Sequence, residues 1–441
     1  MSPNRRTRTR TSDRGHLLTR FSRILLPGVQ FRQHGQSRYA WSDRTVKLAR
    51  GRSLMSGGWR GIYTAQNGLA QTLSSSAMGS ANKWLSDAEI ERSKERTRNN
   101  SQRTRIHHFV PQMYLRRWAS GPESPLVRFT EIATGRSDLD LPDAIANDEF
   151  FYQIVGDDID ADVEPDLWFE THMSRIEDAA ARWLRSLDNR AAGKITDPNL
   201  SGNLAVFVGL QSQRTPRARA GNLDISSARD RFNVREALDH RALLPILCAA
   251  TGIDYTPARH HQIIDEIMLQ PEYTGPKAAA IDTAIKVWKK HIAPLLAQRT
   301  WWLVTSEQPL LTCDEPVVLI GWPGQQRYPA PALATAALVM FPIGPHRLLL
   351  ATPESHRLRP PFTLSPEETR AENLEIASNA IEFTYEETSS DISAHMTLPP
   401  LPPFDRSTAT NFWEALRPPP GRWAGLNAPE WPLQRWTAST P

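Results

Sequence analysis

Three polar clusters lie at the edges of otherwise apolar segments of this 441-residue chain. They are IHHFVPQMYLRRW (Ile106 to Trp118), QSQRTP (Gln211 to Pro216) and LLTCDEPVV (Leu310 to Val318). Each cluster places His, Gln, Arg or Asp where a sequence that only packs a core would carry aliphatic side chains. The sequence therefore predicts that the three segments converge on one polar site.

The first cluster offers two imidazoles as catalytic groups, His107 and His108. A neutral imidazole binds a metal or moves a proton near neutral pH. If the backbone is extended here, the two side chains point to opposite sides, so only one faces a shared pocket. His108 is then the better candidate, because Phe109 and Val110 alternate around it. The competing interpretation is that one histidine caps a helix and the other is solvated.

Two carboxylates border the apolar stripe of a predicted helix, Glu170 and Glu177. They are seven residues apart, which places them on nearly the same helix face. Such a pair is a candidate site for a divalent metal ion, or it pairs with Arg214. The alternative is a solvated helix flank that faces Arg175 or Arg182.

The second cluster ends a predicted helix with Gln211 and Arg214, which we expect to bind substrate. Their spacing of three residues puts both head groups on the buried side of the last turn. The guanidinium is a planar fork for a carboxylate or a phosphate. The alternative is a buried structural ion pair between Arg214 and either Asp314 or Glu177.

The third cluster places Asp314 after a β-prone run and before Pro316. This context exposes a carboxylate at a strand tip, where a rigid element positions reactive groups, so Asp314 is the third catalytic candidate. An Asp that forms a turn before proline is the competing interpretation. Cys313 is expected to be a small packed side chain, because no base lies near it in the sequence.

These segments resemble the domain-of-unknown-function 4238 family, which carries a His-(His/Tyr)-x-Val-Pro-Gln-x-Tyr-Leu segment, a Gln-x-x-Arg-Thr-Pro helix end and a Ser-Asp-Asn-Pro-Val strand end. The matching residues are His107, His108, Val110, Pro111, Gln112, Tyr114, Leu115, Gln211, Arg214, Thr215, Pro216, Asp314, Pro316 and Val317. The resemblance covers roughly residues 106 to 390 and departs from the pattern at Cys313 and Glu315. It implies a shared domain and brings no assigned activity.

The apolar periodicity predicts a helical middle region. Between Glu164 and Leu187, apolar residues recur at alternating steps of four and three and form one stripe. Further helices are predicted over Pro198 to Arg214, Ser226 to Leu247, Pro257 to Leu269, Pro276 to Gln298 and Ser365 to Ser378. Ser365 is expected to cap the last of these, with Pro366 at its first position.

Short β-prone runs precede and follow the helices. They are Leu126 to Thr130, Phe150 to Val155, Trp301 to Thr305, Val317 to Ile320, Ala337 to Phe341, Arg347 to Ala351 and Ile381 to Tyr385. The order predicts an α+β fold, in which the helical middle region packs against a C-terminal antiparallel sheet.

Charge divides the chain into three predicted parts. Residues 1–105 hold 21 Lys and Arg against 6 Asp and Glu, whereas residues 106–441 hold 31 against 42. We expect 1–105 to be a basic disordered leader, or a misplaced translation start upstream of Met55 or Met78. Residues 106–397 are predicted to form one domain. Residues 398–441, with ten prolines and four tryptophans, form an arm that is either packed by its aromatic side chains or mobile.

Several protein classes find no support in the sequence. There is no apolar run of 18 residues that would span a membrane and no secretory signal, which leaves the cytoplasm as the default location. The two cysteines form no CxxC pair. No Walker-type loop or dinucleotide-binding glycine pattern occurs, and a His-Asn-His set of His108, Asn147 and His172 is too loosely spaced to be specific.

Three hypotheses follow for the polar site. The first is a metal-assisted hydrolase of a phosphate-containing substrate, with nucleic acid as a possible partner, in which His108, Glu170, Glu177 and Asp314 surround a cation and Arg214 neutralises phosphate. The second is a non-catalytic protein that binds a small anionic ligand through Gln211 and Arg214. In the third, the clusters form a structural network that joins the helices to the sheet.

Overall fold

The computed structural model describes residues 78–100, 105–120, 125–154, 165–239, 244–246, 248, 253–268, 277–405, 408–409, 414 and 417–437. Contacts divide the chain into two units. The larger unit comprises Thr72–Arg229 and Thr274–Pro441, and the smaller one includes Asp230–Tyr273. The chain passes from the first to the second within helix α8 (Pro216–Leu238).

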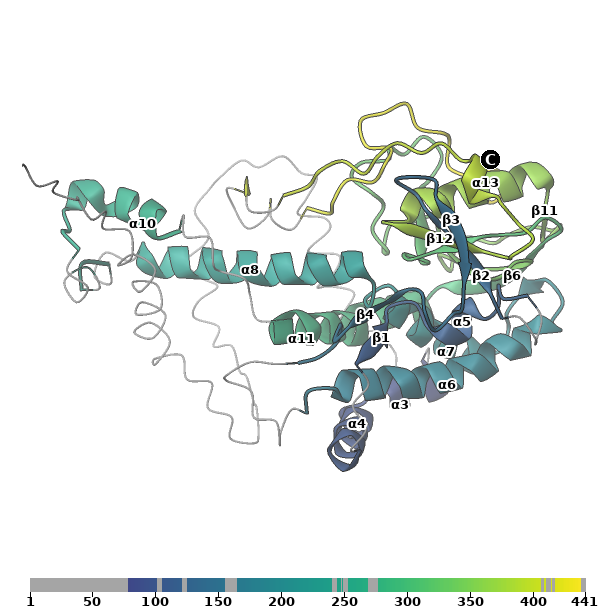
Figure 1. The fold of residues 1–441 in the computed structure, drawn as a ribbon, viewed down its shortest axis with the longest axis horizontal. Coiled ribbons are helices and arrows are strands. Elements are labelled where there is room, and N and C mark those ends of the chain that lie inside the picture. The colour runs from purple at the N-terminus through teal and green to yellow at the C-terminus, as the bar shows by residue number, and fades with distance from the viewer. Residues whose placement is uncertain are drawn as a thin grey trace, which may run out of the picture. The chain divides into compact units, whose positions relative to one another are not determined.

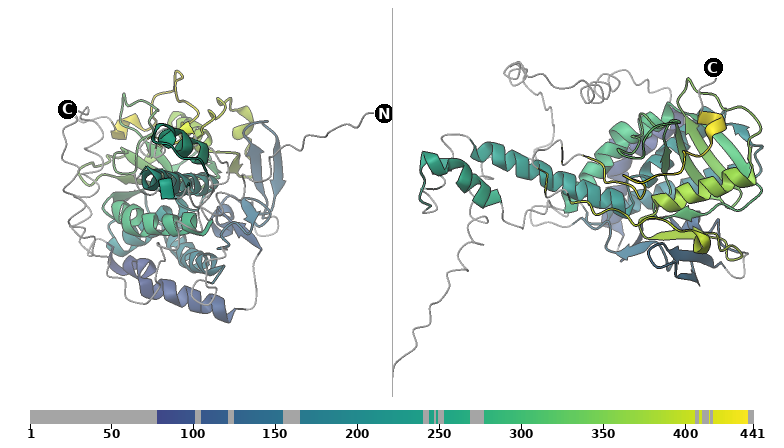
Figure 2. Two further views of the ribbon diagram at one scale, coloured as in Figure 1. Left: turned by 90° about the vertical axis from the view of Figure 1, so that its left-hand side faces the viewer. Right: turned by 90° about the horizontal axis from the view of Figure 1, so that it is seen from above.

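The larger unit contains a sheet of six strands, as the C-terminal β-prone runs predicted. The strand order is β11 (Thr363–Leu364), β6 (Thr300–Ser306), β10 (Arg347–Thr352), β9 (Leu338–Gly344) and β8 (Val318–Ile320), and β5 (Gly193–Lys194) also pairs with β6. All pairs are antiparallel except β11 with β6. The strands run side by side beside helix α13 (Pro366–Asn379) in Figure 2.

A second antiparallel sheet joins distant parts of the chain. Its order is β3 (Ser137–Asp140), β2 (Val127–Glu131), β12 (Phe383–Glu386) and β7 (Thr312–Cys313). A separate pair consists of β1 (Ile106–His108) and β4 (Asn147–Glu149). The strand predicted at Phe150 to Val155 is wrong, because the pairing ends at Glu149 and Phe150 turns the chain with a φ of 51°.

The helical middle region is confirmed, and the fold is α+β. Helix α6 (Trp168–Asp188) carries the predicted stripe, of which Met173, Ile176 and Ala180 are fully buried. Helix α7 (Pro198–Gln211) is apolar on nearly all sides and packs between α6 and α12 (Ala293–Ala297). Trp288 of the π-helical turn η4 (Trp288–Ile292) donates to the Val206 carbonyl at 3.1 Å and joins the same core.

Helix boundaries differ from the prediction at proline residues. Helix α8 begins at Pro216, ten residues before the predicted Ser226, because proline suits the first turn of a helix although it cannot continue one. Helix α13 has the predicted Ser365 cap, and Glu368 completes a capping box. The remaining described helices are η2 (Gly79–Ala81), α3 (Asn82–Leu85), α4 (Asp87–Asn99), α5 (Gln112–Leu115), η3 (Pro257–Arg259), α10 (His260–Met268), α11 (Lys277–Val287), η5 (Ser393–His395) and α15 (Gln434–Thr437).

Ordered structure begins well before the predicted boundary at Ile106. Met78, Ala81, Trp84 and Leu85 belong to the same core as α6 and α7. Gly202 of α7 permits this contact, because a Cβ there would lie 2.7 Å from the Met78 carbonyl oxygen. The N-terminal helices are therefore part of the larger unit, although residues 1–77 lie outside the described residues.

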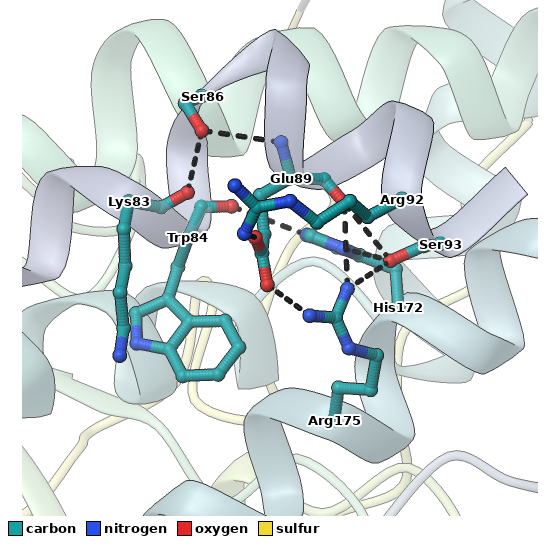
Figure 3. Close-up of polar contacts among 8 residues, drawn as sticks. All are labelled: Lys83, Trp84, Ser86, Glu89, Arg92, Ser93, His172 and Arg175. Atoms are coloured by element: carbon teal, nitrogen blue, oxygen red, sulfur yellow. Dashed lines mark hydrogen bonds and ion pairs between the residues drawn. The ribbon is translucent and has the colours of Figure 1, made fainter. Parts of the chain in front are cut away.

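A buried polar network fixes α4 against α6 (Figure 3). Glu89 pairs with Arg175, and Arg175 also donates to Ser93 Oγ at 2.8 Å. Ser93 Oγ lies 2.9 Å from His172 Nδ1, while His172 Nε2 lies 3.2 Å from the Trp84 carbonyl. Since a carbonyl can only accept, Nε2 carries a proton and donates to Trp84. Burial lowers the pKa of His172, so the ring is uncharged at neutral pH and its Nδ1 faces the Ser93 hydroxyl.

The C-terminal arm packs through its aromatic side chains, which is one of the two predicted alternatives. Trp431, Leu433 and Trp436 are buried in a second apolar cluster with strands β6, β8 and β10. Trp431 fits closely against Gly321, where a Cβ would come within 2.6 Å of the indole. Among the described residues, no helix is both long enough and apolar enough to cross a bilayer.

Because His172 belongs to the network in Figure 3, we expect the protein to lose stability in acid through this residue. Burial, together with the nearby Arg175 charge, lowers the pKa of His172 from 6.5 to about 4. The unfolded chain therefore takes up a proton as the pH falls below 6.5, while the folded chain does not until about pH 4. We expect the free energy of unfolding, measured in urea titrations, to be roughly 2–3 kcal/mol lower at pH 4.5 than at pH 7 through this group alone.

The variant His172→Gln isolates this contribution, because glutamine does not titrate. Its stability difference between the two pH values should be smaller than that of the wild type by the same amount. An identical pH dependence in both proteins would contradict the assignment.

Candidate functional site

The three polar segments meet in the larger unit, where direct hydrogen bonds join every pair of them. Tyr114 Oη lies 2.7 Å from Thr312 Oγ1, and Trp118 Nε1 donates to the Leu310 carbonyl at 2.8 Å. Gln211 Nε2 donates to the Phe109 carbonyl at 2.9 Å. Thr215 of the second segment makes a side-chain hydrogen bond to Glu315, and the amide of Arg217, just beyond that segment, donates to Glu315 Oε1 at 3.0 Å. Figure 1 shows β1, β4, α5, α6 and α7 in this region of the unit.

Arg214 lies at the centre and is only 1 % exposed. Its guanidinium pairs with the Glu177 carboxylate and donates to the His108 carbonyl. The Tyr152 hydroxyl donates to the Arg214 carbonyl at 2.6 Å, and Arg214 Nε lies 3.4 Å from the same hydroxyl. Burial opposes the guanidinium charge, but Glu177, Tyr152 and Glu170 together raise the pKa of Arg214. Of the two proposed ion-pair partners, the structure places Glu177 there.

Gln211 and Arg214 hold consecutive carbonyls of the first segment, those of Phe109 and His108. Gln211 is 1 % exposed, and its Oε1 has no hydrogen-bond partner within the described part of the chain. In this arrangement, both side chains position the backbone of β1. Substrate contact by either one remains a hypothesis.

Glu170 lies in the same cluster, one turn from the start of α6. Burial raises its pKa to about 8, Arg214 opposes this rise and Glu177 adds to it. Its Oε2 is buried without a hydrogen-bond partner among the described residues. Glu170 is therefore mostly a neutral acid at pH 7.

The set of Glu170, Glu177 and His108 does not fit a divalent cation as arranged here. The Arg214 guanidinium already pairs with Glu177 and influences both Glu170 and His108. A metal ion at the two carboxylates would face this positive charge in a poorly solvated site, which is unfavourable. The Glu177 carboxylate pairs with Arg214 instead.

The two histidines point to opposite sides of β1, as an extended backbone requires. His107 is fully buried, stacks on Tyr152, and accepts the Tyr152 amide at Nδ1 with a length of 2.9 Å. Its Nδ1 lone pair is therefore occupied. His108 is half-buried and reaches the edge of the cluster. Of the two histidines, His108 is therefore the one whose side chain reaches solvent.

The nearest polar contact of the His108 ring favours one tautomer. Nε2 lies 3.1 Å from the Asp143 carbonyl, which can only accept, so this contact favours a proton on Nε2 and leaves the Nδ1 lone pair facing Gln112 Nε2 at 3.4 Å. Burial lowers the pKa of His108 below 6.5; the hydrogen bond to Asp143 opposes this, and the Arg214 and Arg116 charges add to it. At pH 7 the imidazole is neutral, with a basic nitrogen at the edge of the site.

Three residues beside His108 were not among the predicted site residues. Gln112 Nε2 lies 3.4 Å from His108 Nδ1, and the exposed Arg116 donates to Gln112 Oε1 at 2.9 Å. Asn147 faces His108 across the strand pair, with Nδ2 3.4 Å from Nε2. The spacing of four between Gln112 and Arg116 was a usable signal for one helical face. We call His108, Gln112, Arg116 and Asn147 the rim.

Asp314 lies apart from the Arg214 cluster. Its carboxylate accepts the amides of Ile381, Glu382 and Phe383 at 2.9, 2.7 and 3.0 Å, respectively. Burial raises the pKa of Asp314, and these three hydrogen bonds oppose the rise. Asp314 thus fixes the start of β12 against β7. Its neighbour Cys313 is fully buried, and burial raises its thiol pKa, as expected of a packed side chain.

The Arg214–Glu177 pair predicts a large stability effect. In Arg214→Met, the Glu177 carboxylate loses its partner beside Glu170, and the His108 carbonyl loses a donor. We expect the free energy of unfolding to fall by about 3 kcal/mol in urea titrations, because breaking a buried pair leaves a charge uncompensated.

The matched control is Arg370→Met, which removes an exposed pair with Glu367 whose side chains are 71 % and 74 % exposed. Its effect should stay below about 1 kcal/mol. Equal effects for the two variants would show that Arg214 is not a structural centre.

A family model described as protein of unknown function (DUF4238) matches residues 106–390. No curated protein and no solved structure matches the chain. The matched range contains all three polar segments, the Arg214 cluster and the rim. Helices α3 and α4 and the C-terminal arm pack in the larger unit outside that range.

Proposed function

The chain belongs to the family described as protein of unknown function (DUF4238), and from this premise we propose that its rim hydrolyses a phosphate-containing substrate with His108 as general base. The single observation that carries the proposal is the contact between His108 Nε2 and the Asp143 carbonyl. Because Nε2–H is held by the Asp143 carbonyl, Nδ1 is the proton acceptor, on a half-buried ring that is neutral at pH 7.

The proposed reaction needs one water molecule. Its oxygen attacks phosphorus and its proton passes to His108 Nδ1, while the phosphorus–oxygen ester bond breaks. The leaving oxygen takes a proton from solvent, and the imidazolium returns its own proton to bulk water. Proton transfer to a positioned base of this kind accelerates reactions by roughly 10²–10⁴-fold.

Arg116 is the proposed contact for the phosphate charge. It is exposed, and its guanidinium donates to the Gln112 side chain, which in turn lies against the imidazole. A guanidinium donates two parallel hydrogen bonds to phosphate oxygens. The Gln112 amide adds a donor beside the ring, whereas Asn147 Nδ2 donates to the carbonyls of Asp143 and Ile145.

Arg214 and Glu177 enter this proposal as positioning residues. Arg214 donates to the backbone carbonyl of His108, which leaves the imidazole available to the other rim residues. No step runs through a metal ion at Glu170 and Glu177, since the guanidinium takes that place. Nucleic acid is one phosphate-containing substrate that this rim would accept.

The test uses bis-p-nitrophenyl phosphate and p-nitrophenyl phosphate, with the full chain, in the presence and absence of EDTA. We expect slow hydrolysis that persists in EDTA and falls at least about 100-fold in His108→Gln. The acidic limb of kcat/KM should lie below pH 6.5 in the wild type, since the pKa of His108 is lowered, and should vanish in the variant.

His395→Gln is the control, because His395 is an exposed histidine that pairs with Asp391 on η5. It should hydrolyse both esters at the wild-type rate. Turnover that is unchanged in His108→Gln, or that requires an added metal, would contradict the proposal.

A second candidate is binding of a small anionic ligand without reaction. The observation in its favour is that Arg116 and the Gln112 amide supply donors without any need for a base. Saturable binding of inorganic phosphate or ATP, lost in Arg116→Ala and without turnover of either ester, would support this alternative.

A further inference from the structure

A group of potential metal ligands occurs in the smaller unit, away from the rim in sequence. We propose that Asp239, His260 and His261 form a Zn²⁺ site. Their ligating atoms all lie within 4.8 Å of one another, and they form the one such group of three or more found among the residues that the structure describes. The inference is independent of the proposed hydrolysis.

The distances match coordination better than hydrogen bonding. Asp239 Oδ1 lies 3.4 Å from His260 Nε2 and 3.5 Å from His261 Nδ1. Zinc bonds of roughly 2.0–2.1 Å at tetrahedral angles separate neighbouring ligand atoms by about 3.3–3.4 Å. A good hydrogen bond to a carboxylate is shorter, at about 2.7–2.9 Å. Asp239 Oδ1 therefore lies at about the distance from each imidazole nitrogen that is expected when the atoms bind one shared ion.

The surroundings orient His260 for this role. Its Nδ1 lies 3.1 Å from the Tyr255 hydroxyl, which leaves Nε2 to face Asp239 and His261. Ligating histidines generally use the second ring nitrogen in such a hydrogen bond, which fixes the orientation of the ring. The His260 side chain is only 13 % exposed, whereas His261 is 79 % exposed. The site thus has one fixed ligand and an open side to solvent.

The ligands come from the ends of two helices. Asp239 directly follows α8, and its amide donates to the Arg235 carbonyl at 2.9 Å. His260 and His261 begin α10, and their rings stand nearly perpendicular, at 87°. Arg235 pairs with Asp265 at 2.8 Å and so joins the same two helices one turn further along. An ion at the three ligands would clamp the end of α8 to the start of α10.

Zinc is the cation that this donor set favours. Two imidazoles and one carboxylate suit a borderline ion, whereas Mg²⁺ prefers six oxygen ligands. Three protein ligands leave a fourth position for water. The proposed role of the zinc ion is structural, because it would link the two helices that supply its ligands.

The experiment uses the full chain without a polyhistidine tag, treated with EDTA and then freed of chelator. Calorimetric titration with ZnCl₂ should show one equivalent per chain, and MgCl₂ should give no heat of binding. Asp239→Asn and His261→Ala should each weaken Zn²⁺ binding at least about 10-fold. Asp239 is 58 % exposed, so the near-isosteric asparagine leaves packing intact.

The matched control is His395→Ala, which removes the imidazole of an exposed His–Asp pair whose atoms are 3.1 Å apart. It should bind zinc as the wild type does. The visible absorption of a Co²⁺-loaded sample should show tetrahedral coordination, and this signal should be lost in Asp239→Asn. Zinc binding that is absent from the wild type, or equal in the wild type and the Asp239 variant, would overturn the proposal.

Discussion

The larger unit depends on the placement of one buried cation. Arg214 is almost wholly removed from solvent, so its charge must be compensated and its N–H groups must find acceptors within the fold. Glu177 of α6 supplies the charge, and the His108 carbonyl of β1 supplies an acceptor. These two contacts join three elements that are far apart in sequence. The hydrogen bond from this guanidinium to the His108 carbonyl holds the segment that carries His108 in place.

The same electrostatic centre sets the protonation of its neighbours. Glu170 is kept mostly neutral at pH 7 because burial outweighs the attraction of Arg214. His108 is kept neutral because burial and the guanidinium both disfavour an imidazolium. An acid and a base with opposite pKa shifts thus lie on either side of one cation, a combination that enzymes often use. The buried part of the cluster provides rigidity, and the chemistry proposed here belongs to its exposed rim.

Local patterns in the sequence predicted the long helices of the middle region and six of the twelve described strands. The three polar segments contact one another, but Asp314 of the third segment lies apart from the Arg214 cluster. The alternation along α6 and the cap at Ser365 are local signals, and both are confirmed. Phe150 was misassigned because a positive φ is set by the turn that follows β4, which hydrophobicity does not encode. The predicted start of the fold at Ile106 lies too late in the chain. The sequence of α4 is mostly polar, so the prediction missed the apolar contacts that Trp84 and Leu85 make in the preceding helix α3. Long-range packing decides which carboxylate pairs with Arg214. Residue spacing in the sequence does not distinguish Glu177 from Asp314.

A double-mutant cycle on Arg214 and Glu177 tests the central claim most directly. The free energies of unfolding would be measured for the wild type, Arg214→Met, Glu177→Gln and the double variant. If the ion pair organises the cluster, the two substitutions are strongly non-additive, with a coupling free energy of at least about 1.5 kcal/mol. Additive effects, with coupling below about 0.5 kcal/mol, would show that the buried guanidinium and the Glu177 carboxylate do not act as one unit.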